Sequence, residues 1–272
     1  MLIPVEASER PQLLTLFGPS YPNLAFVHAV LQGKLPGQAW ARFQGQAATA
    51  CLITTSAPFC FASGDVDEAT LGEMLQLLAA RPPVKLIYPA APTAHPRASD
   101  AFGAFDAFGA FDAFDAFDHG FAPAKRLQFS HAHPQDGERL LVEIPGPYRL
   151  AAIDEALFDA ILWKDMVLGI YGSPAHYVRH HFGFALLHEG RVAAEAHGVV
   201  GGDLVELGVF THPDHRRQGL SVLLGAQIAR HGARLGLRMV VTCDADKVAS
   251  IAIATALGLR RDFSYGILDL PR

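Results

Sequence analysis

The chain has 272 residues, of which 50% are hydrophobic and 18% charged, and it carries a formal net charge of −5. This composition is typical of a globular protein with an apolar core, and it excludes the basic surface of a nucleic-acid-binding protein. The length suits two domains better than one. Neither a leader-like N-terminus nor a run of about 18 apolar residues is evident, so we expect a cytoplasmic protein without a membrane span.

Three cysteines occur in the chain, Cys51, Cys60 and Cys243. Their number is odd and no pair has C-x-x-C spacing, so the sequence predicts neither a disulfide framework nor a zinc site. The pattern is typical of a protein from a reducing compartment.

The first 88 residues alternate between short apolar segments and breaks that contain Gly or Pro. Helical segments are predicted over residues 5–32, with an interruption at 18–23, where Asn23 is suited to cap the second helix. A later helix opens with acidic residues and ends at Pro82-Pro83. That helix is expected at 65–80, and strands are expected at 38–43, 47–55, 58–62 and 84–88.

Residues 101–118 repeat the triplet Ala-Phe-Asp or Ala-Phe-Gly. A period of three fits neither a strand nor a helix, because on a helix successive Phe rings would advance by about 300° and form no stripe. We interpret the repeat as a low-complexity insertion within or beside a helix. An aromatic patch that binds a partner protein is the alternative.

A strand predicted over residues 124–131 completes an order of elements that recurs later in the chain. Residues 59–129 and 205–268 both follow the order strand, helix, strand, helix, Gly-Phe or Gly-Leu, strand. We therefore expect a tandem of two similar halves, with chance agreement as the alternative. The expected division is an N-terminal domain at 1–133, a linker at 134–147 and a C-terminal domain at 148–272.

The linker contains an apolar run at 140–144 that is compatible with a strand. After it, the sequence predicts two helices, the first capped by Asp154, and a hairpin around His188-Glu189-Gly190. The helices are expected at 154–168 and 174–180, and the hairpin strands at 182–187 and 192–199. Strands at 237–243 and 260–270 then flank a helix at 244–257.

The stretch from Val205 to Gly236 predicts a strand, a short basic loop and a helix. Residues 205–211 alternate with a period of two, and Pro213 ends the strand. The loop Arg216-Arg217-Gln218-Gly219 leads into a helix start, where free N–H groups and the positive end of the dipole suit a pyrophosphate. The corresponding loop of the first half, 64–68, contains three carboxylates, which would repel one.

The run Arg216-Arg217-Gln218-Gly219-Leu220-Ser221 resembles the acetyl-CoA signature of the GCN5-related N-acetyltransferases (GNAT), Gln/Arg-x-x-Gly-x-Gly/Ala, from which Ser221 departs. The resemblance implies a mixed α/β (α+β) GNAT fold, an acyltransferase activity and acetyl-CoA as cosubstrate. It also implies that the motif strand pairs with the pantetheine arm and that an N–H near Val209 stabilises the oxyanion. The cofactor-binding residues expected from it are Val209, Phe210, Thr211, Arg216, Arg217, Gln218, Gly219, Leu220 and Ser221. In this tandem, the N-terminal half would be degenerate and the C-terminal half active.

Two positions near the C-terminus depart from the family pattern. Lys247 stands where the family often has an Asn, and Ala254 where it often has a Tyr that protonates the leaving thiolate. Together with Thr211 and Ser250, the pattern resembles the zwittermicin-A-resistance-like branch most closely. Because Ala254 cannot donate a proton to the leaving thiolate, the candidates for the general acid are Tyr265, Cys243 and Ser250, and solvent is the alternative.

Glu206, on the predicted motif strand, is our candidate for the base that accepts the proton of the amine. Its strand face is shared with Gly208 and Phe210, and an exposed strand Glu is the alternative interpretation. Aromatic residues stand where family members build the acceptor pocket, although core packing accounts for Trp163 more readily. These residues are Trp163, Tyr171 and Tyr177.

His176 and His180 are four residues apart, a spacing that suits metal ligands on one helix face. No third ligand is evident in the sequence, so we expect no metal site.

The sequence thus predicts an N-acetyltransferase that moves an acetyl group from acetyl-CoA to a primary amine of a small molecule or peptide. Direct transfer in a ternary complex is expected, because no nucleophile triad is evident. The expected protein is a monomer or homodimer without nucleic-acid or membrane partners. An acetyl-CoA-binding sensor or interaction protein without turnover is the alternative, motivated by Lys247 and Ala254.

Overall fold

The computed structural model of the chain describes residues 1–81, 84–88 and 122–270. In this part of the chain, twelve strands form one sheet in the order β1-β2-β3-β4-β5-β12-β6-β11-β10-β9-β8-β7. The first six strands of the chain are β1 (Ile3–Pro4), β2 (Gly37–Gln44), β3 (Ala47–Thr55), β4 (Phe59–Gly64), β5 (Val84–Ile87) and β6 (Ala122–Ser130). The other six are β7 (Tyr148–Ala152), β8 (Phe182–His188), β9 (Arg191–Gly201), β10 (Leu204–Thr211), β11 (Arg238–Asp244) and β12 (Arg260–Leu270).

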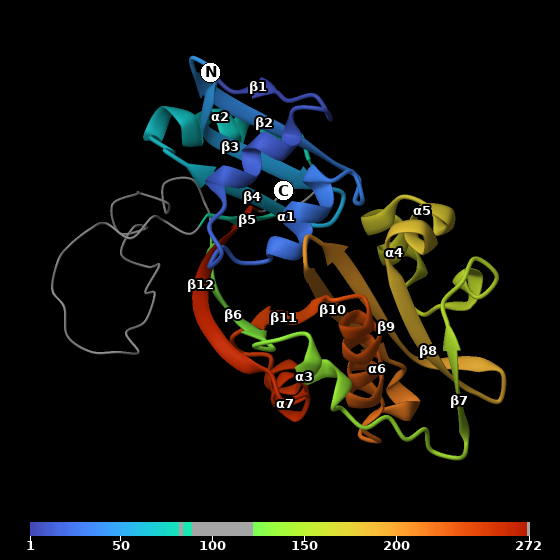
Figure 1. Ribbon diagram of the computed structural model, residues 1–272. Coiled ribbons are helices and arrows are strands. Elements are labelled where there is room, and N and C mark those ends of the chain that lie inside the picture. Colours follow the sequence, from blue (N-terminus) through green and yellow to red (C-terminus); the bar gives the residue numbers. More distant parts are fainter. Residues whose placement is uncertain (82–83, 89–121, 271–272) are drawn as a thin grey trace, which may run out of the picture.

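Helices pack against the strands of both halves (Figure 1). In the N-terminal half they are the 3-10 helix η1 (Arg10–Leu16) and the α-helices α1 (Leu24–Leu31) and α2 (Glu68–Ala79). Further along the chain they are α3 (Gln135–Glu138), η4 (Phe158–Ala160), α4 (Lys164–Tyr171), α5 (Pro174–His180), η5 (Pro213–His215), α6 (Leu220–Arg234) and α7 (Val248–Ala256). The order β4, α2, β5, β6 recurs as β10, α6, β11, β12, as the sequence predicts for these elements. The helix expected before the last strand of the first half lies outside the described residues.

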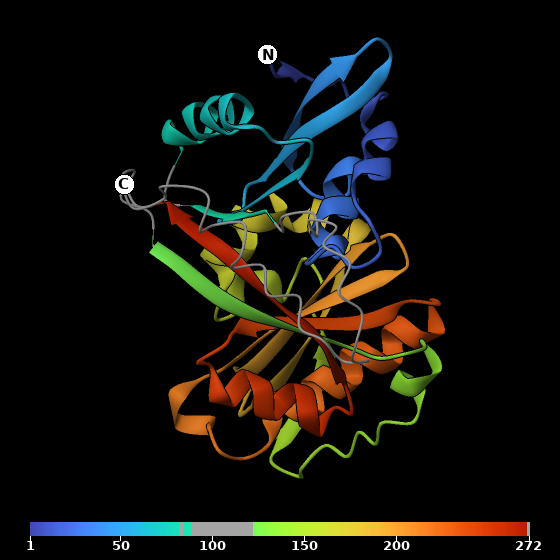
Figure 2. The same cartoon turned by 90° about the vertical axis from the view of Figure 1, so that its left-hand side faces the viewer.

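The last strand of each half leaves its own strands and joins those of the other half. β6 pairs with β11, whereas β12 pairs with β5. The two exchanged strands also pair with each other in antiparallel orientation, and Figure 2 shows them side by side between the two halves. The exchange makes one continuous sheet, because each half is completed by a strand from the other.

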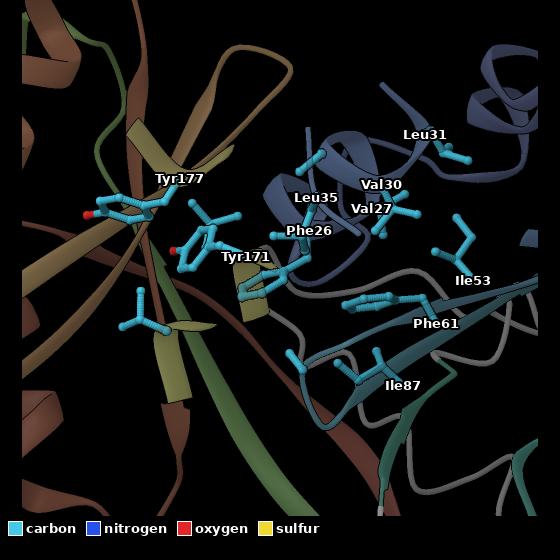
Figure 3. Packing of buried hydrophobic residues seen from close by; sticks show 14 of the residues in the cluster. Phe26, Val27, Val30, Leu31, Leu35, Ile53, Phe61, Ile87, Tyr171 and Tyr177 are labelled. Atoms are coloured by element: carbon cyan, nitrogen blue, oxygen red, sulfur yellow. The ribbon is translucent and has the colours of Figure 1, made fainter. Parts of the chain in front are cut away.

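One apolar cluster extends across both halves. It contains Phe26 of α1 and Phe61 of β4 together with Tyr171 of α4 and Tyr177 of α5, and Figure 3 shows these residues packed at close range. Tyr171 and Tyr177 are only 2% and 0% exposed. These two residues, which the sequence places near an acceptor pocket, are therefore core residues that join the halves.

Helix α1 of the N-terminal half packs directly on β9 of the C-terminal half. A Cβ at Gly201 would overlap with the carbonyl oxygen of Ala25, so only glycine allows this approach. On the other side of the contact, the side chains of His176 and His181 each donate from Nε2 to the carbonyl oxygen of Lys34, at 2.8 and 2.7 Å. Both apolar packing and hydrogen bonds thus hold the two halves in contact.

The helix predicted over 154–168 is wrong. Asp154 accepts a hydrogen bond from the N–H of Leu157 in a turn that precedes the short helix η4. The helical conformation is then interrupted, because the buried carboxylate of Glu195 accepts hydrogen bonds from the N–H groups of Leu162 and Trp163 at 2.5 and 2.8 Å. Helix α4 begins only after this break and continues to Tyr171.

The strand considered for 140–144 is absent from the described residues, where this segment pairs with no strand. Leu140, Val142 and Ile144 instead pack against the apolar cluster to which α6 contributes, whereas Leu141 is exposed. Part of the expected linker is also docked, because Gly137 in α3 lies against the backbone of Ala229. The Ala-Phe repeat at 101–118 lies outside the described residues.

Candidate active site

Strands β10 and β11 diverge in the middle of the sheet. Their parallel pairing covers only Leu204, Val205 and Glu206, opposite residues 238–240. Beyond that point β11 continues to pair with β6, while β10 pairs only with β9. The second half of β10 therefore lacks a strand partner on its β11 side within the described residues.

Backbone groups on this open side belong to every second residue of β10. The N–H of Arg238 donates to the carbonyl oxygen of Asp203, so the odd-numbered residues direct their N–H and C=O groups toward β11. On the opposite side, the N–H of His212 donates to Ala193 of β9. Val209 thus directs its N–H and C=O groups, and Thr211 its N–H group, to the open edge, where an extended ligand could pair with them as an added strand. The carbonyl oxygen of Thr211 accepts from Nε of Arg216 at 3.3 Å.

The basic loop after β10 leads into an uncapped helix. Gly219, the N-cap residue of α6, has a left-handed backbone (φ 75°), and no side chain caps the helix. Arg217 also has a positive φ of 66°, and Arg216, Arg217 and Gln218 are exposed. The first N–H groups of a 15-residue helix are thus available beside two guanidinium groups, an arrangement that favours a phosphate.

Tyr148 of β7 holds this loop in place. Its hydroxyl donates to Oε1 of Gln218 at 2.7 Å and lies 3.0 Å from Nδ1 of His215. Ser221 is also fixed, because its hydroxyl lies 2.8 Å from that of Thr211. Ser221 at the usual Gly or Ala position thus links the helix start to the end of β10.

Glu206 lies where β10 and β11 separate and is only 4% exposed. Its Oε1 accepts from Nδ2 of Asn23 at 2.6 Å and from the hydroxyl of Thr242 at 2.7 Å. Among the described residues, Oε2 has no hydrogen-bond partner. One carboxylate oxygen is therefore anchored by two hydrogen bonds, while the other is buried without a partner in the described part of the chain.

Burial raises the pKa of Glu206 to about 7. The hydrogen bond from Thr242, the charge of Arg126 and the hydrogen bond from Asn23 act in the opposite direction. A carboxyl group with a pKa near neutrality can accept a proton and release it again at physiological pH, as a general base must.

The N-terminal half contains the same strand divergence without these groups. β4 pairs in parallel with β5 at Phe59, Cys60 and Phe61, so Phe61 occupies the position that Glu206 has in the other half. The hydroxyl of Tyr21 lies between the separating strands, 2.8 Å from the carbonyl oxygen of Ala62 and 2.9 Å from that of Ile87.

Helix α2 also differs from α6 at its N-terminus. The N-cap residue Asp67 accepts a hydrogen bond from the N–H of Thr70 at 2.7 Å and forms an ion pair with Arg42. The carboxylate thus occupies the helix end where an anion would bind. The hydrogen bonds from Thr70 and the nearby Arg42 hold the pKa of Asp67 low, at about 2, so it repels anions at neutral pH.

The other residues that the sequence analysis considered for the acceptor pocket and for the general acid lie at several positions in the fold. The ring of Trp163 lies 5.0 Å from that of Phe210 at the edge of β10, and both are half-buried. Ala254 is fully buried in the core, and burial raises the pKa of both Cys243 and Tyr265. Ser250 is half-buried and Lys247 is exposed, respectively within and before α7.

Several residues of this site could not be assigned to it from the sequence. Asn23 occupies the predicted N-cap position of α1, but its side chain contacts Glu206 instead of the helix. The contact joins residues 183 positions apart. The other residues missed are Tyr148, Thr242 and Arg126.

Residues 1–81, 84–88 and 122–270 contain no helix long and apolar enough to span a membrane. Over the same residues, no group of three or more His, Cys, Asp or Glu side chains is arranged to hold a metal ion. His176 is instead hydrogen bonded to Lys34.

Comparison with known proteins agrees with this geometry. A model of the GNAT acetyltransferase family matches residues 20–268. The fold is similar to that of a GCN5-related N-acetyltransferase-like protein from Streptococcus suis 89/1591, with a TM-score of 0.71 and 19% identity over 97% of this chain and 98% of that one. It is also similar to a tandem GNAT protein from the clavulanic acid biosynthesis pathway, with a TM-score of 0.61 and 15% identity over 99% and 98% of the two chains. No curated protein sequence matches the chain.

Proposed function

Because this chain belongs to the GNAT acetyltransferase family, we propose that it moves an acetyl group from acetyl-CoA to a primary amine by direct transfer in a ternary complex. The chain is an acyltransferase with a mixed α/β GNAT fold. The observation that carries the proposal is the position of Glu206, a buried carboxylate with one free oxygen at the point where β10 and β11 separate.

Residues of β10 and α6 fit acetyl-CoA, which would supply an activated acetyl thioester. The uncapped start of α6 and the side chain of Arg216 would hold the pyrophosphate. The open edge of β10 would pair with the pantetheine arm, and the N–H of Val209 would donate to the acetyl oxygen as negative charge develops there. Glu206 would accept the amine proton, directly or through one water.

We further propose that the N-terminal half, residues 1–133, has no acetyl-CoA site of its own, and that residues 134–147 link it to a catalytic domain at 148–272. Three differences support this division of roles. Phe61 replaces the carboxylate, Tyr21 lies between the separating strands, and Asp67 occupies the helix N-terminus.

The other details of the function stay predictions: a small-molecule or peptide acceptor, a cytoplasmic location, a monomer or homodimer, and the zwittermicin-A-resistance-like branch. The acceptor can be sought by incubating the full chain with acetyl-CoA and a panel of amines and measuring free-thiol release. Thiol release that depends on the amine, with the acetylated product seen by mass spectrometry, is the expected result. Tight CoA binding without release for any amine would favour a sensor.

Removing the phosphate contacts of the loop should weaken CoA binding. Arg216→Ala deletes a charge-assisted contact and is expected to weaken affinity by about 10- to 100-fold, from the roughly 1.5–3 kcal/mol of such bonds. Gly219→Asp places a carboxylate against the pyrophosphate and should abolish measurable binding. Calorimetric titration with CoA measures both.

Gly236→Asp is a matched control for Gly219→Asp. Both glycines have φ of 75°, a Cβ at either would meet no atom within 4 Å, and they lie at opposite ends of α6. The backbone strain of the two substitutions is therefore similar, while only Gly219 lies beside the predicted phosphate. Equal CoA affinity in Gly219→Asp and Gly236→Asp would show that the loop assignment is wrong.

Equilibrium dialysis with labelled acetyl-CoA should give one site per chain. The half with Phe61, Tyr21 and Asp67 lacks both the free helix start and the open strand edge, so it should take up no ligand. The single site should disappear in Gly219→Asp. Two equivalent sites, or one site that survives this substitution, would contradict the proposed division of roles.

A further inference from the structure

A row of hydrogen bonds connects Arg126 to Glu206 through two residues, Tyr265 and Asn23. Nε of Arg126 on β6 lies 3.1 Å from the hydroxyl of Tyr265 on β12. This hydroxyl lies 2.7 Å from Oδ1 of Asn23 at the start of α1, and Nδ2 of Asn23 lies 2.6 Å from Oε1 of Glu206 on β10. Both Asn23 and Glu206 are buried, at 0% and 4% exposure.

The direction of every bond in this row is determined by chemistry. A guanidinium only donates, so the Tyr265 oxygen accepts from Arg126 and its own hydrogen is left for Asn23. Oδ1 of Asn23 therefore accepts, and its NH₂ group must face the carboxylate. The row carries the polarisation of a permanent positive charge to one oxygen of Glu206.

We propose that Tyr265 and Asn23 are positioning residues that fix the carboxylate of Glu206, hold Oε1 as its permanently hydrogen-bonded oxygen and leave Oε2 to take the amine proton. The inference rests on the proposed role of Glu206 as the base. It gives the N-terminal half a part in the reaction, because Asn23 completes a site whose base lies in the C-terminal half.

Two observations support a dedicated role for Asn23. Its backbone is left-handed (φ 54°, ψ 33°), a conformation that asparagine tolerates better than most residues. Its own N–H donates to Oε1 of Gln128 at 3.1 Å, and a second bond from Nδ2 reaches the hydroxyl of Thr242 at 2.9 Å. The side chain is thus held at every polar atom and cannot turn without breaking several bonds.

Other charged and titratable groups also influence Glu206. Arg126 on β6 forms an ion pair with Asp244 of β11 at 2.5 Å. Arg126 and Tyr265 of β12 both interact electrostatically with Glu206. Tyr171 of α4 is also buried and interacts electrostatically with Glu206, but it has no hydrogen bond to the row in the described part of the chain. It therefore offers a matched tyrosine outside the row.

The test compares Tyr265→Phe with Tyr171→Phe in the full chain. Each variant loses one buried hydroxyl near Glu206, but only Tyr265→Phe breaks the row and frees the Asn23 amide to turn. Titration of ¹³C-labelled glutamate carboxyls by NMR, with the Glu206 signal assigned from Glu206→Gln, gives the midpoint for Glu206. In Tyr265→Phe this midpoint is expected to rise by about one pH unit, which is a tenfold fall in the ratio of carboxylate to carboxylic acid at a given pH.

Tyr171→Phe should leave the midpoint within about 0.3 units of the parent value. Asn23→Gly, which keeps the left-handed backbone and removes the amide, should raise it as Tyr265→Phe does and provides a second variant should the first fail to fold. Equal midpoints in the parent, Tyr265→Phe and Asn23→Gly, with unchanged circular dichroism, would overturn the proposal.

The pH dependence of kcat/KM with an identified acceptor separates this inference from the proposed function. The acidic limb of the profile should move with the NMR midpoint in Tyr265→Phe and stay in place in Tyr171→Phe. If the midpoint rises and the limb does not move, the row fixes the carboxylate but Glu206 is not the base. In that case the proposed function of Glu206 fails while the hydrogen-bonded row stands.

Discussion

Glu206→Gln is expected to lower the rate of acetyl transfer at neutral pH by about 10²-fold or more, with CoA affinity nearly unchanged. Glutamine keeps the size of the side chain and can still accept from Asn23 and Thr242, but it cannot take a proton. The proposed phosphate contacts lie in the loop after β10 and at the start of α6. Rate and affinity should therefore separate in this variant.

Raising the pH should restore part of the activity of Glu206→Gln, because a larger fraction of the acceptor amine is then already neutral. Steady-state rates from pH 6 to 10, together with calorimetric CoA titration, measure this rescue. A misfolded variant would lose CoA binding and show no rescue. Parent-like turnover of Glu206→Gln across the whole range would place the base elsewhere.

The strand, basic loop and helix from Val205 to Gly236 could be predicted because their signals are local. Alternation of side chains, Pro213 and the helical spacing after Gly219 each depend on residues close together in the chain. The structure places β10, η5 and α6 in this order and leaves the start of α6 without a side-chain cap. Local patterns of this kind are sufficient to locate a candidate phosphate loop.

The exchange of β6 and β12 could not be predicted, because no local pattern states which edge a strand joins. The same limit applies to the contact between Asn23 and Glu206, which depends on how α1 of one half packs on the strands of the other. The error over 154–168 has a related cause. A buried carboxylate, Glu195, takes the backbone N–H groups that a continuous helix would use internally.

The proposal that the first half has no phosphate loop rests partly on local and partly on long-range features. Acidic residues at 64–68 predict it from charge alone, and the structure shows that Asp67 caps α2. The strongest feature, however, is the position of Tyr21 between β4 and β5, which depends on the loop before α1. The sequence thus predicts the negative charge at the start of α2, but it does not predict that the side chain of Tyr21 lies between β4 and β5.

Glu206 is also expected to make the folded state less stable as the pH rises. Its pKa is about 7 in the folded protein and 4.5 as an unperturbed group, so the folded state binds the proton more tightly. The contribution of Glu206 to stability is therefore greatest below pH 4.5, falls between pH 4.5 and 7 and levels off above. Between pH 5 and 8 the loss amounts to about 2–3 kcal/mol, from 1.36 kcal/mol per pKa unit.

His181 acts in the opposite direction over part of this range. Burial lowers its pKa to about 4, so its contribution is complete above pH 6.5 and is lost as the pH falls toward 4. The parent curve mixes both groups, and the difference between Glu206→Gln and the parent isolates Glu206. Urea unfolding at pH 5 and 8 should show that the relative stability of Glu206→Gln increases by about 2–3 kcal/mol. A difference that stays constant with pH would mean that Glu206 titrates as an ordinary exposed carboxyl group and is not held in the buried environment that its proposed role requires.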